Sequence, residues 1–157
     1  MTTVRGRGER QQWAPDLAVL AARLTASTQQ ELFDELRERG HRDVRPRHGP
    51  VIAFLDEEGV RATDLARLSG LHKQVVGRLV DELEELGIVA RTPDPADRRA
   101  KLVVPTAKGT ALVLDADEIV AGIESRHAQA VGRKNYAAFR DAMRDVVQNS
   151  RPIRPLG

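Results

Sequence analysis

The side chains with the clearest chemical potential lie in two short stretches, residues 72–78 and 91–101. The first stretch contains Lys73 and Arg78 and no acidic residue, whereas residues 81–85 hold four acidic residues and no base. An anionic duplex would attract the first half of such a helix and repel the second, so the helix could approach nucleic acid only end-first. The same pattern also fits an ordinary amphipathic helix with uneven surface charge.

Motifs for enzymatic chemistry are absent from the sequence. It contains no Gly-x-Ser-x-Gly, no His-Glu-x-x-His and no phosphate-binding glycine loop. The acidic runs 56–58 and 81–85 are expected on polar helix faces or at a helix end, where solvated surface is favoured over acid–base catalysis. His41 and His48 are seven residues apart with only Asp43 nearby, which matches no common metal-ligand spacing. We therefore expect no catalytic residue, no metal, no cofactor and no enzyme.

Composition limits the class of protein. The chain has 157 residues, of which 41% are hydrophobic and 31% charged, with 25 basic and 23 acidic residues, a net charge of +2 and no cysteine. It is long enough for one domain with extensions. No apolar run approaches the roughly 20 residues that span a bilayer, and no apolar segment follows the basic N-terminus. These features, with the missing cysteines, predict a cytoplasmic protein.

The apolar periodicity predicts helices on both sides of a β-hairpin. A flexible basic tail, 1–12, is followed by a long amphipathic helix from Trp13, with Pro15 in its first turn, that ends near Gly40; its apolar stripe needs a partner. Further expected elements are a short helix around 51–55, a helix capped by Thr63 and ending at Ser69-Gly70, a helix that ends at Gly87, strands 88–91 and 101–104, a helix capped by Thr106 that reaches about Gly132, and a last helix that includes 136–147.

Residues 62–109, ATDLARLSGLHKQVVGRLVDELEELGIVARTPDPADRRAKLVVPTAKG, closely resemble the DNA-binding core of MarR-type transcriptional regulators. The resemblance is carried by LHKQVVGRLVDELEELGIV, by the wing sequence DPADRRAKLVV and by the closing TAKG. It implies a mainly α fold with a small β-hairpin wing, in which a winged helix-turn-helix core is flanked by N- and C-terminal dimerisation helices.

The resemblance also implies a division of the chain. The expected parts are the tail 1–12, an N-terminal dimerisation helix and connector at 13–48, a winged helix-turn-helix domain at 49–109, C-terminal dimerisation helices at 110–150 and a tail at 151–157. Two such chains would form a homodimer whose winged domains straddle an operator in double-stranded DNA.

Residues of the recognition helix are carried over from the family pattern. Its exposed N-terminal face becomes His72, Lys73, Gln74, Gly77 and Arg78. The amide of Gln74 has the geometry for an adenine edge, and Lys73 or Arg78 can reach guanine or a phosphate. Where relatives commonly carry a small hydroxyl residue, this chain has His72 and Val75. We expect His72 to contact DNA and Val75 to face the core rather than a thymine methyl.

In the wing, Arg98 and Arg99 are the candidates for the minor groove, where a narrow A/T-rich stretch concentrates negative potential. One of them can instead pair with Asp94 or Asp97, and by resemblance Asp97 orients an arginine. Arg91 and Lys101 are candidate phosphate contacts, with solvated strand positions as the equal alternative.

An effector site is a further expectation. In relatives the pocket for small anionic aromatic effectors lies where the dimer helices meet the DNA-binding lobe. Trp13, His41, Arg45 and His48 are chemically suited to a carboxylate or phenol, although the segment 37–48 also fits a solvated basic connector.

The sequence therefore predicts a sequence-specific, double-stranded DNA-binding regulator, a ligand-responsive homodimeric repressor on a pseudo-palindromic operator. Two alternatives remain. A winged-helix protein-interaction module should have a wing without basic residues, and a nonspecific DNA-coating protein should have a larger positive charge than +2.

Overall fold

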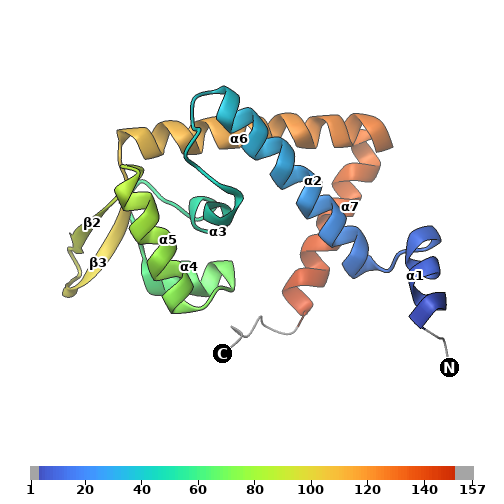
Figure 1. Ribbon diagram of the computed structural model, residues 1–157, viewed down its shortest axis with the longest axis horizontal. Helices are drawn as coiled ribbons and strands as arrows, with labels where there is room; N and C mark the ends of the chain where they lie inside the picture. Colours follow the sequence, from blue (N-terminus) through green and yellow to red (C-terminus); the bar gives the residue numbers. More distant parts are fainter. Residues whose placement is uncertain (1–3, 151–157) are drawn as a thin grey trace.

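The computed structural model of the chain describes residues 4–150, which fold mainly into helices with one small antiparallel sheet (Figure 1). The predicted mainly α fold with a β-hairpin wing is confirmed. Residues 151–157, expected to form a tail, lie outside the described residues. The elements are α1 (Val4–Trp13), α2 (Leu17–Glu38), η1 (Pro46–His48), α3 (Gly49–Ile52), β1 (Val60–Arg61), α4 (Ala62–Ser69), α5 (Lys73–Glu85), β2 (Val89–Asp94), β3 (Asp97–Pro105), α6 (Ala107–Val131) and α7 (Arg133–Asn149).

The N-terminal region differs from the expected flexible tail, because residues 4–13 form helix α1. A side-chain contact joins its end to the start of α2: Asp16 accepts a hydrogen bond from Gln11 Nε2 (2.5 Å), and the Asp16 N–H donates to Gln11 Oε1 (2.9 Å). Asp16 also caps α2 by accepting from the Val19 N–H. The sequence had suggested that Pro15 lies in the first turn of this helix. In the structure Pro15 instead precedes the N-cap Asp16 and lies outside α2.

Helix α4, the first helix of the helix-turn-helix, begins two residues earlier than expected. Arg61, not Thr63, is the N-cap of α4, and Thr63 lies inside the helix. The reason is β1, a two-residue strand that sequence periodicity could not reveal: its pairing with β3 keeps Arg61 extended until α4 starts. Gly70 ends α4 at φ 71°, a left-handed conformation that glycine adopts without steric cost, and the chain turns directly toward α5.

The three strands pair in the order β1-β3-β2, and the hairpin is longer than predicted. Pro93 pairs with Lys101, and Asp94 with Asp97, so the expected loop between the strands shrinks to a turn at residues 95–96. Pro93 is tolerated because β2 is an edge strand and the register shifts between Pro93 and Asp94. The wing is consequently a continuous ribbon that carries its basic residues near the tip.

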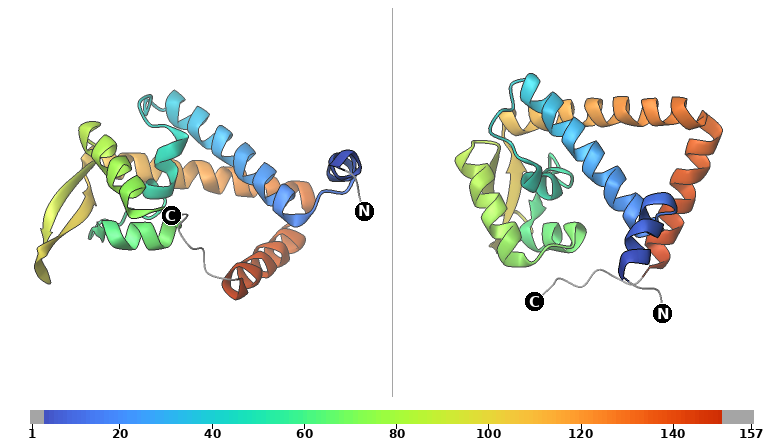
Figure 2. Two further views of the ribbon diagram at one scale, coloured as in Figure 1. Left: turned by 60° about the horizontal axis from the view of Figure 1, so that its bottom comes forward. Right: turned by 45° about the vertical axis from the view of Figure 1, so that its right-hand side comes forward.

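The core lies in one lobe formed by the second half of α2, α3–α5, the sheet and the first part of α6. Buried members include Phe33, Leu36, Val51, Leu65, Val76, Leu79, Val80, Leu83, Ile88, Val103, Leu112, Ile119 and Ile123. By contrast α7 has no buried residue, and large apolar side chains on the terminal helices are exposed. Figure 2 shows these helices extending away from the lobe. Within residues 4–150, no helix combines the length and apolar character that a membrane crossing requires.

Candidate nucleic-acid interface

Helix α5 presents its N-terminal end to solvent. His72 is the N-cap, and its Nδ1 accepts from the Gln74 N–H (3.3 Å). The side chains of His72, Lys73, Gln74 and Arg78 are exposed, while Val76 and three later apolar residues are buried in the lobe. Because the buried side holds the helix against the lobe, the exposed basic and amide groups are available to a partner. Four of the five residues predicted for this face are thus exposed, and Gly77 is partly buried.

The acidic C-terminal half of α5 is bound to the lobe and is not merely solvated. Arg91 of β2 donates to Asp81 (2.5 Å) and to Glu84, and its backbone N–H also donates to Glu84. Arg91, expected to be a phosphate contact or a solvated residue, is therefore occupied by two carboxylates of the recognition helix. This corrects both alternatives, since a guanidinium held by two carboxylates is poorly placed to neutralise a phosphate.

The wing carries exposed Arg98, Arg99 and Lys101 on β3. Neither Arg98 nor Arg99 forms an ion pair within the described part of the chain. Asp97 accepts the backbone N–H of Arg99 (3.1 Å), so its role is to shape the turn and not to hold a guanidinium. With respect to residues 4–150, the wing tip thus keeps two free positive charges.

A residue that sequence reasoning missed holds the wing close to its turn. Arg61 of β1 pairs with the buried Asp94 at 2.5 Å, in place of the expected wing arginine. The Ala96 N–H, followed by the Arg61 guanidinium, holds the pKa of Asp94 below its usual range. No local signal marks this pair, because the two residues are 33 positions apart and β1 has only two residues.

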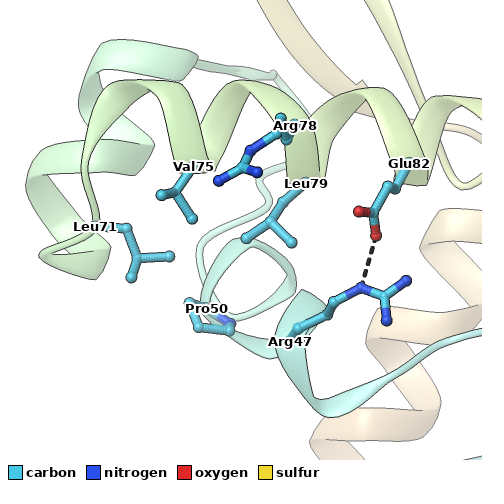
Figure 3. A pocket seen from close by; sticks show the side chains of 7 residues that line it. All are labelled: Arg47, Pro50, Leu71, Val75, Arg78, Leu79 and Glu82. Carbon is cyan, nitrogen blue, oxygen red and sulfur yellow. Dashed lines mark hydrogen bonds and ion pairs between the residues drawn. The ribbon is translucent and has the colours of Figure 1, made fainter.

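A groove of about 430 Å³ lies between the η1–α3 segment and α5 (Figure 3). Leu71, Val75 and Leu79 line it from the helix-turn-helix and Pro50 from α3, with Arg78 and the Arg47–Glu82 pair at its edge. Val75 is only partly buried and lines this groove, whereas its neighbour Val76 enters the core. The expectation that Val75 faces the core is correct only in part.

Two histidines of the connector form structural bridges. His48 is buried; its Nδ1 accepts from the Arg45 N–H (3.1 Å), and its Nε2 lies 2.8 Å from Glu82 Oε2. These partners require the proton on Nε2, which donates to Glu82, and this bond, with Arg47, lowers the pKa of Glu82. His41 binds Asp115 of α6 at 2.7 Å and lowers the pKa of that carboxyl, with help from Arg39.

The four residues suggested for an effector are therefore not brought together in the chain. Trp13 lies at the opposite end of α2 from the connector, about 33 Å away along a helix of 22 residues. His41 and His48 are engaged with carboxylates, and only Arg45 is exposed and basic.

A separate cavity of about 360 Å³ lies between α2, α3 and α6. Its lining consists of apolar residues, one glycine and one acid: Leu32, Phe33, Leu36, Gly49, Ile52, Ala53, Leu55, Val113, Ala116, Asp117 and Val120. No basic residue takes part, so the cationic partners expected for an anionic effector do not line it. The cavity lies where the long helices α2 and α6 meet the lobe, but its lining lacks the positive charge expected for an anionic effector.

Comparison with known proteins gives consistent matches. The family model described as MarR family matches residues 42–100. The uncharacterized HTH-type transcriptional regulator YcgE of Bacillus subtilis is 46% identical over 53 residues, a segment that spans 33% of this chain and 34% of YcgE.

Solved structures extend the match beyond that segment. CouR from Rhodococcus jostii RHA1, solved with p-coumaroyl-CoA, has a TM-score of 0.71 and 30% identity, covering 87% of this chain and 94% of CouR. A MarR-family transcriptional regulator from Rhodococcus sp. RHA1 has a TM-score of 0.69 and 28% identity, covering 86% and 96%. The repressor CouR on a 23-mer DNA duplex shares the fold at 24% identity and a TM-score of 0.71, covering 88% and 96%.

Proposed function

Because this chain belongs to the MarR family of transcriptional regulators, we propose that it binds double-stranded DNA sequence-specifically as a homodimeric repressor. The observation that carries the proposal is the exposed N-terminal end of α5, displayed on the same lobe as a wing whose tip arginines, Arg98 and Arg99, form no ion pair with any residue of 4–150. A recognition helix reads base edges in the major groove while a wing arginine enters the minor groove.

Each exposed residue has a role in this proposal. Gln74 reads an adenine edge, Lys73 and Arg78 contact guanine or phosphate, and His72 donates to the backbone or a base while holding the helix start. Gly77 lets the helix approach the duplex closely. Arg98 or Arg99 enters the minor groove, and Lys101 contacts a phosphate. Arg91 is left out because its guanidinium is bound to α5.

The dimer is supported by uncovered apolar side chains on the helices that flank the lobe. Leu17, Leu20, Val146 and Val147 are each at least half exposed, which is costly for a monomer in water. We infer that 13–48 and 110–150 supply the dimer contacts around the winged domain 49–109, and that the half-sites lie about one helical turn apart.

Repression would follow from occlusion of a promoter, and release from an effector that favours a dimer with a different spacing of recognition helices. DNA and effector then weaken each other reciprocally. CouR, solved with an aromatic acyl thioester, supports an effector with an aromatic body. The apolar cavity between α2, α3 and α6 is the proposed place for that body.

Fluorescence anisotropy on the upstream DNA of the gene, with a shuffled duplex and a salt series, tests the proposal. Tight binding to the native duplex alone, with a steep salt slope, is expected. Equal binding to both duplexes would favour nonspecific coating, and no binding at low salt would favour a protein-interaction module.

The wing contribution is measured in the same assay. Arg98→Ala with Arg99→Ala should weaken binding and lower the salt slope by about 1 for each phosphate that the variant no longer neutralises. Arg133→Ala with Lys134→Ala removes the same charge at the start of α7, away from the lobe, and should leave the slope near that of the unmodified protein. Identical salt slopes for the two variants would show that the wing does not contact DNA.

A further inference from the structure

The cavity between α2, α3 and α6 has a definite electrostatic character. Its walls are aliphatic side chains from all three helices together with the ring of Phe33, and Asp117 of α6 is its one ionisable residue. The volume of about 360 Å³ lies in the range of small-molecule sites. A ligand placed here would meet hydrocarbon on most sides and a carboxylate at one point.

Asp117 differs from the other acids of its helix segment. Asp115 pairs with Arg39 and His41, and Glu118 pairs with the same Arg39. Asp117 forms no ion pair with any residue of the described chain, and its side chain is exposed at the cavity edge. Asp117 is therefore the acid that lines the cavity and has no ionic partner among residues 4–150.

This cavity should bind an anionic ligand only weakly. Moving a carboxylate into an apolar cavity removes its hydration, and no arginine, lysine or histidine of the lining replaces it. Asp117 would add repulsion. An organic cation has the opposite balance, because its ammonium can lie at the wet edge beside Asp117 while the ring of Phe33 and the aliphatic walls contact its apolar body.

We propose that this cavity binds a small lipophilic cation, an amine with an aromatic or branched aliphatic body, whose ammonium pairs with Asp117. Its regulatory meaning rests on the proposed function, since the cation would be the effector that changes DNA binding. The binding itself depends only on the cavity. This chemistry replaces the anionic effector suggested by the family resemblance.

Three probes with one body and different charge test the assignment: 4-phenylbutylamine, 4-phenylbutanol and 4-phenylbutyrate. Isothermal titration calorimetry at neutral pH and low salt should give an affinity for the amine about tenfold higher than for the alcohol, with the carboxylate weakest, because a surface ion pair is of this order. Asp117→Asn should reduce the affinity for the amine to that for the alcohol, and the affinity for the alcohol should not change.

Control variants separate charge from folding. Asp145→Asn removes an exposed carboxylate on α7 and should keep the preference for the amine. Ala116→Phe fills the cavity and should abolish binding of amine and alcohol alike, with circular dichroism confirming a folded protein. Tighter binding of 4-phenylbutyrate, unchanged preference in Asp117→Asn, or binding of no probe would overturn the proposal.

Whether the cation acts as an effector is tested separately, by measuring the affinity for the upstream duplex with fluorescence anisotropy. Weaker DNA binding on addition of 4-phenylbutylamine, absent in Asp117→Asn, would support the cation as effector. Amine binding that leaves DNA affinity unchanged would refute the effector role and retain the site. Amine binding in a protein that ignores DNA would refute the proposed function and retain the site.

Discussion

Gln74 is the residue on which sequence specificity depends most directly. It lies in the first turn of α5, its side chain is exposed, and the His72 ring holds its backbone N–H. Gln74→Ala should cost about 1–3 kcal/mol at one operator position and relax the base preference there, because alanine cannot form the bidentate hydrogen bonds of an amide with adenine. Competition between single-base operator variants measures this.

Glu85→Ala is the matched control for Gln74, since it is exposed at the other end of the same helix. It should leave the base preference as it is. If Gln74→Ala also leaves every position unchanged, Gln74 does not read the operator.

Asp94 makes the stability of the wing depend on pH. The Ala96 N–H and Arg61 lower the pKa of its carboxyl in the folded protein, so the folded state binds fewer protons than the unfolded state. This contribution is fully present above the unfolded pKa of about 3.9 and is lost as pH falls through the lower, folded pKa. Asp94→Asn should therefore make the free energy of unfolding depend less steeply on pH below about pH 4.

Urea unfolding followed by circular dichroism, between about pH 2 and pH 6, gives the required slope. Asp145→Asn, on exposed α7, should retain the acid sensitivity. Equal slopes for Asp94→Asn and the unmodified protein would show that the Arg61–Asp94 pair does not couple wing stability to protonation.

Between elements, the junction of α5, β2 and α6 is a close contact held by side-chain hydrogen bonds to backbone groups. The Thr106 hydroxyl donates to the Gly87 carbonyl (2.6 Å) and accepts from the Gly109 N–H, and Lys108 Nζ donates to the Leu86 carbonyl (2.9 Å). A Cβ built on Gly109 would lie 2.0 Å from the backbone oxygen of Ile88. The end of the recognition helix is therefore bound closely to the start of α6, and rotation of α6 would reorient α5.

Gly109→Ala should lower the free energy of unfolding by at least about 2 kcal/mol, because backbone atoms would have to move apart. Gly122→Ala, in the same helix, meets only an ordinary contact and should stabilise by about 0.5–1 kcal/mol. Urea denaturation of both variants provides the comparison. Similar stabilities would mean that the junction can open at little cost.

The order of the longer elements was predictable from the sequence, whereas α1, β1 and the start of α4 were not. Apolar spacing and the glycines at 70, 87 and 132 marked the helix ends correctly, because these signals act within a few residues. Strand β1 and the cap of α4 were missed, since a two-residue strand exists only through its pairing with Val103 and Leu102 of β3. Helix α1 was also missed, as its sequence has no apolar pattern.

For the whole molecule, the apolar surface of the terminal helices predicts association. Val146 and Val147 are 50% and 63% exposed, so replacing both by glutamate should leave the fold intact and separate the protomers. The double variant should be a monomer at micromolar concentration and should lose most operator affinity, because two linked half-sites no longer act together.

Light scattering coupled to size-exclusion chromatography measures the mass of the Val146→Glu, Val147→Glu variant. Ala62→Glu with Thr63→Glu adds the same charge to the exposed start of α4 and should retain the dimeric mass. A dimeric mass for both variants would show that this part of α7 is not in the interface.

The sequence by itself determined the winged helix-turn-helix, the exposed end of the recognition helix and the basic wing, because periodicity, caps and turn residues are local signals. Only the tertiary structure decided which charges are free. Arg91 and His48 are bound to α5, Arg61 takes the carboxylate expected for a wing arginine, and Asp117, beside an apolar cavity, has no ionic partner among residues 4–150. Such pairings join residues far apart in the chain, and a charge in a sequence does not say which partner the packing will bring to it.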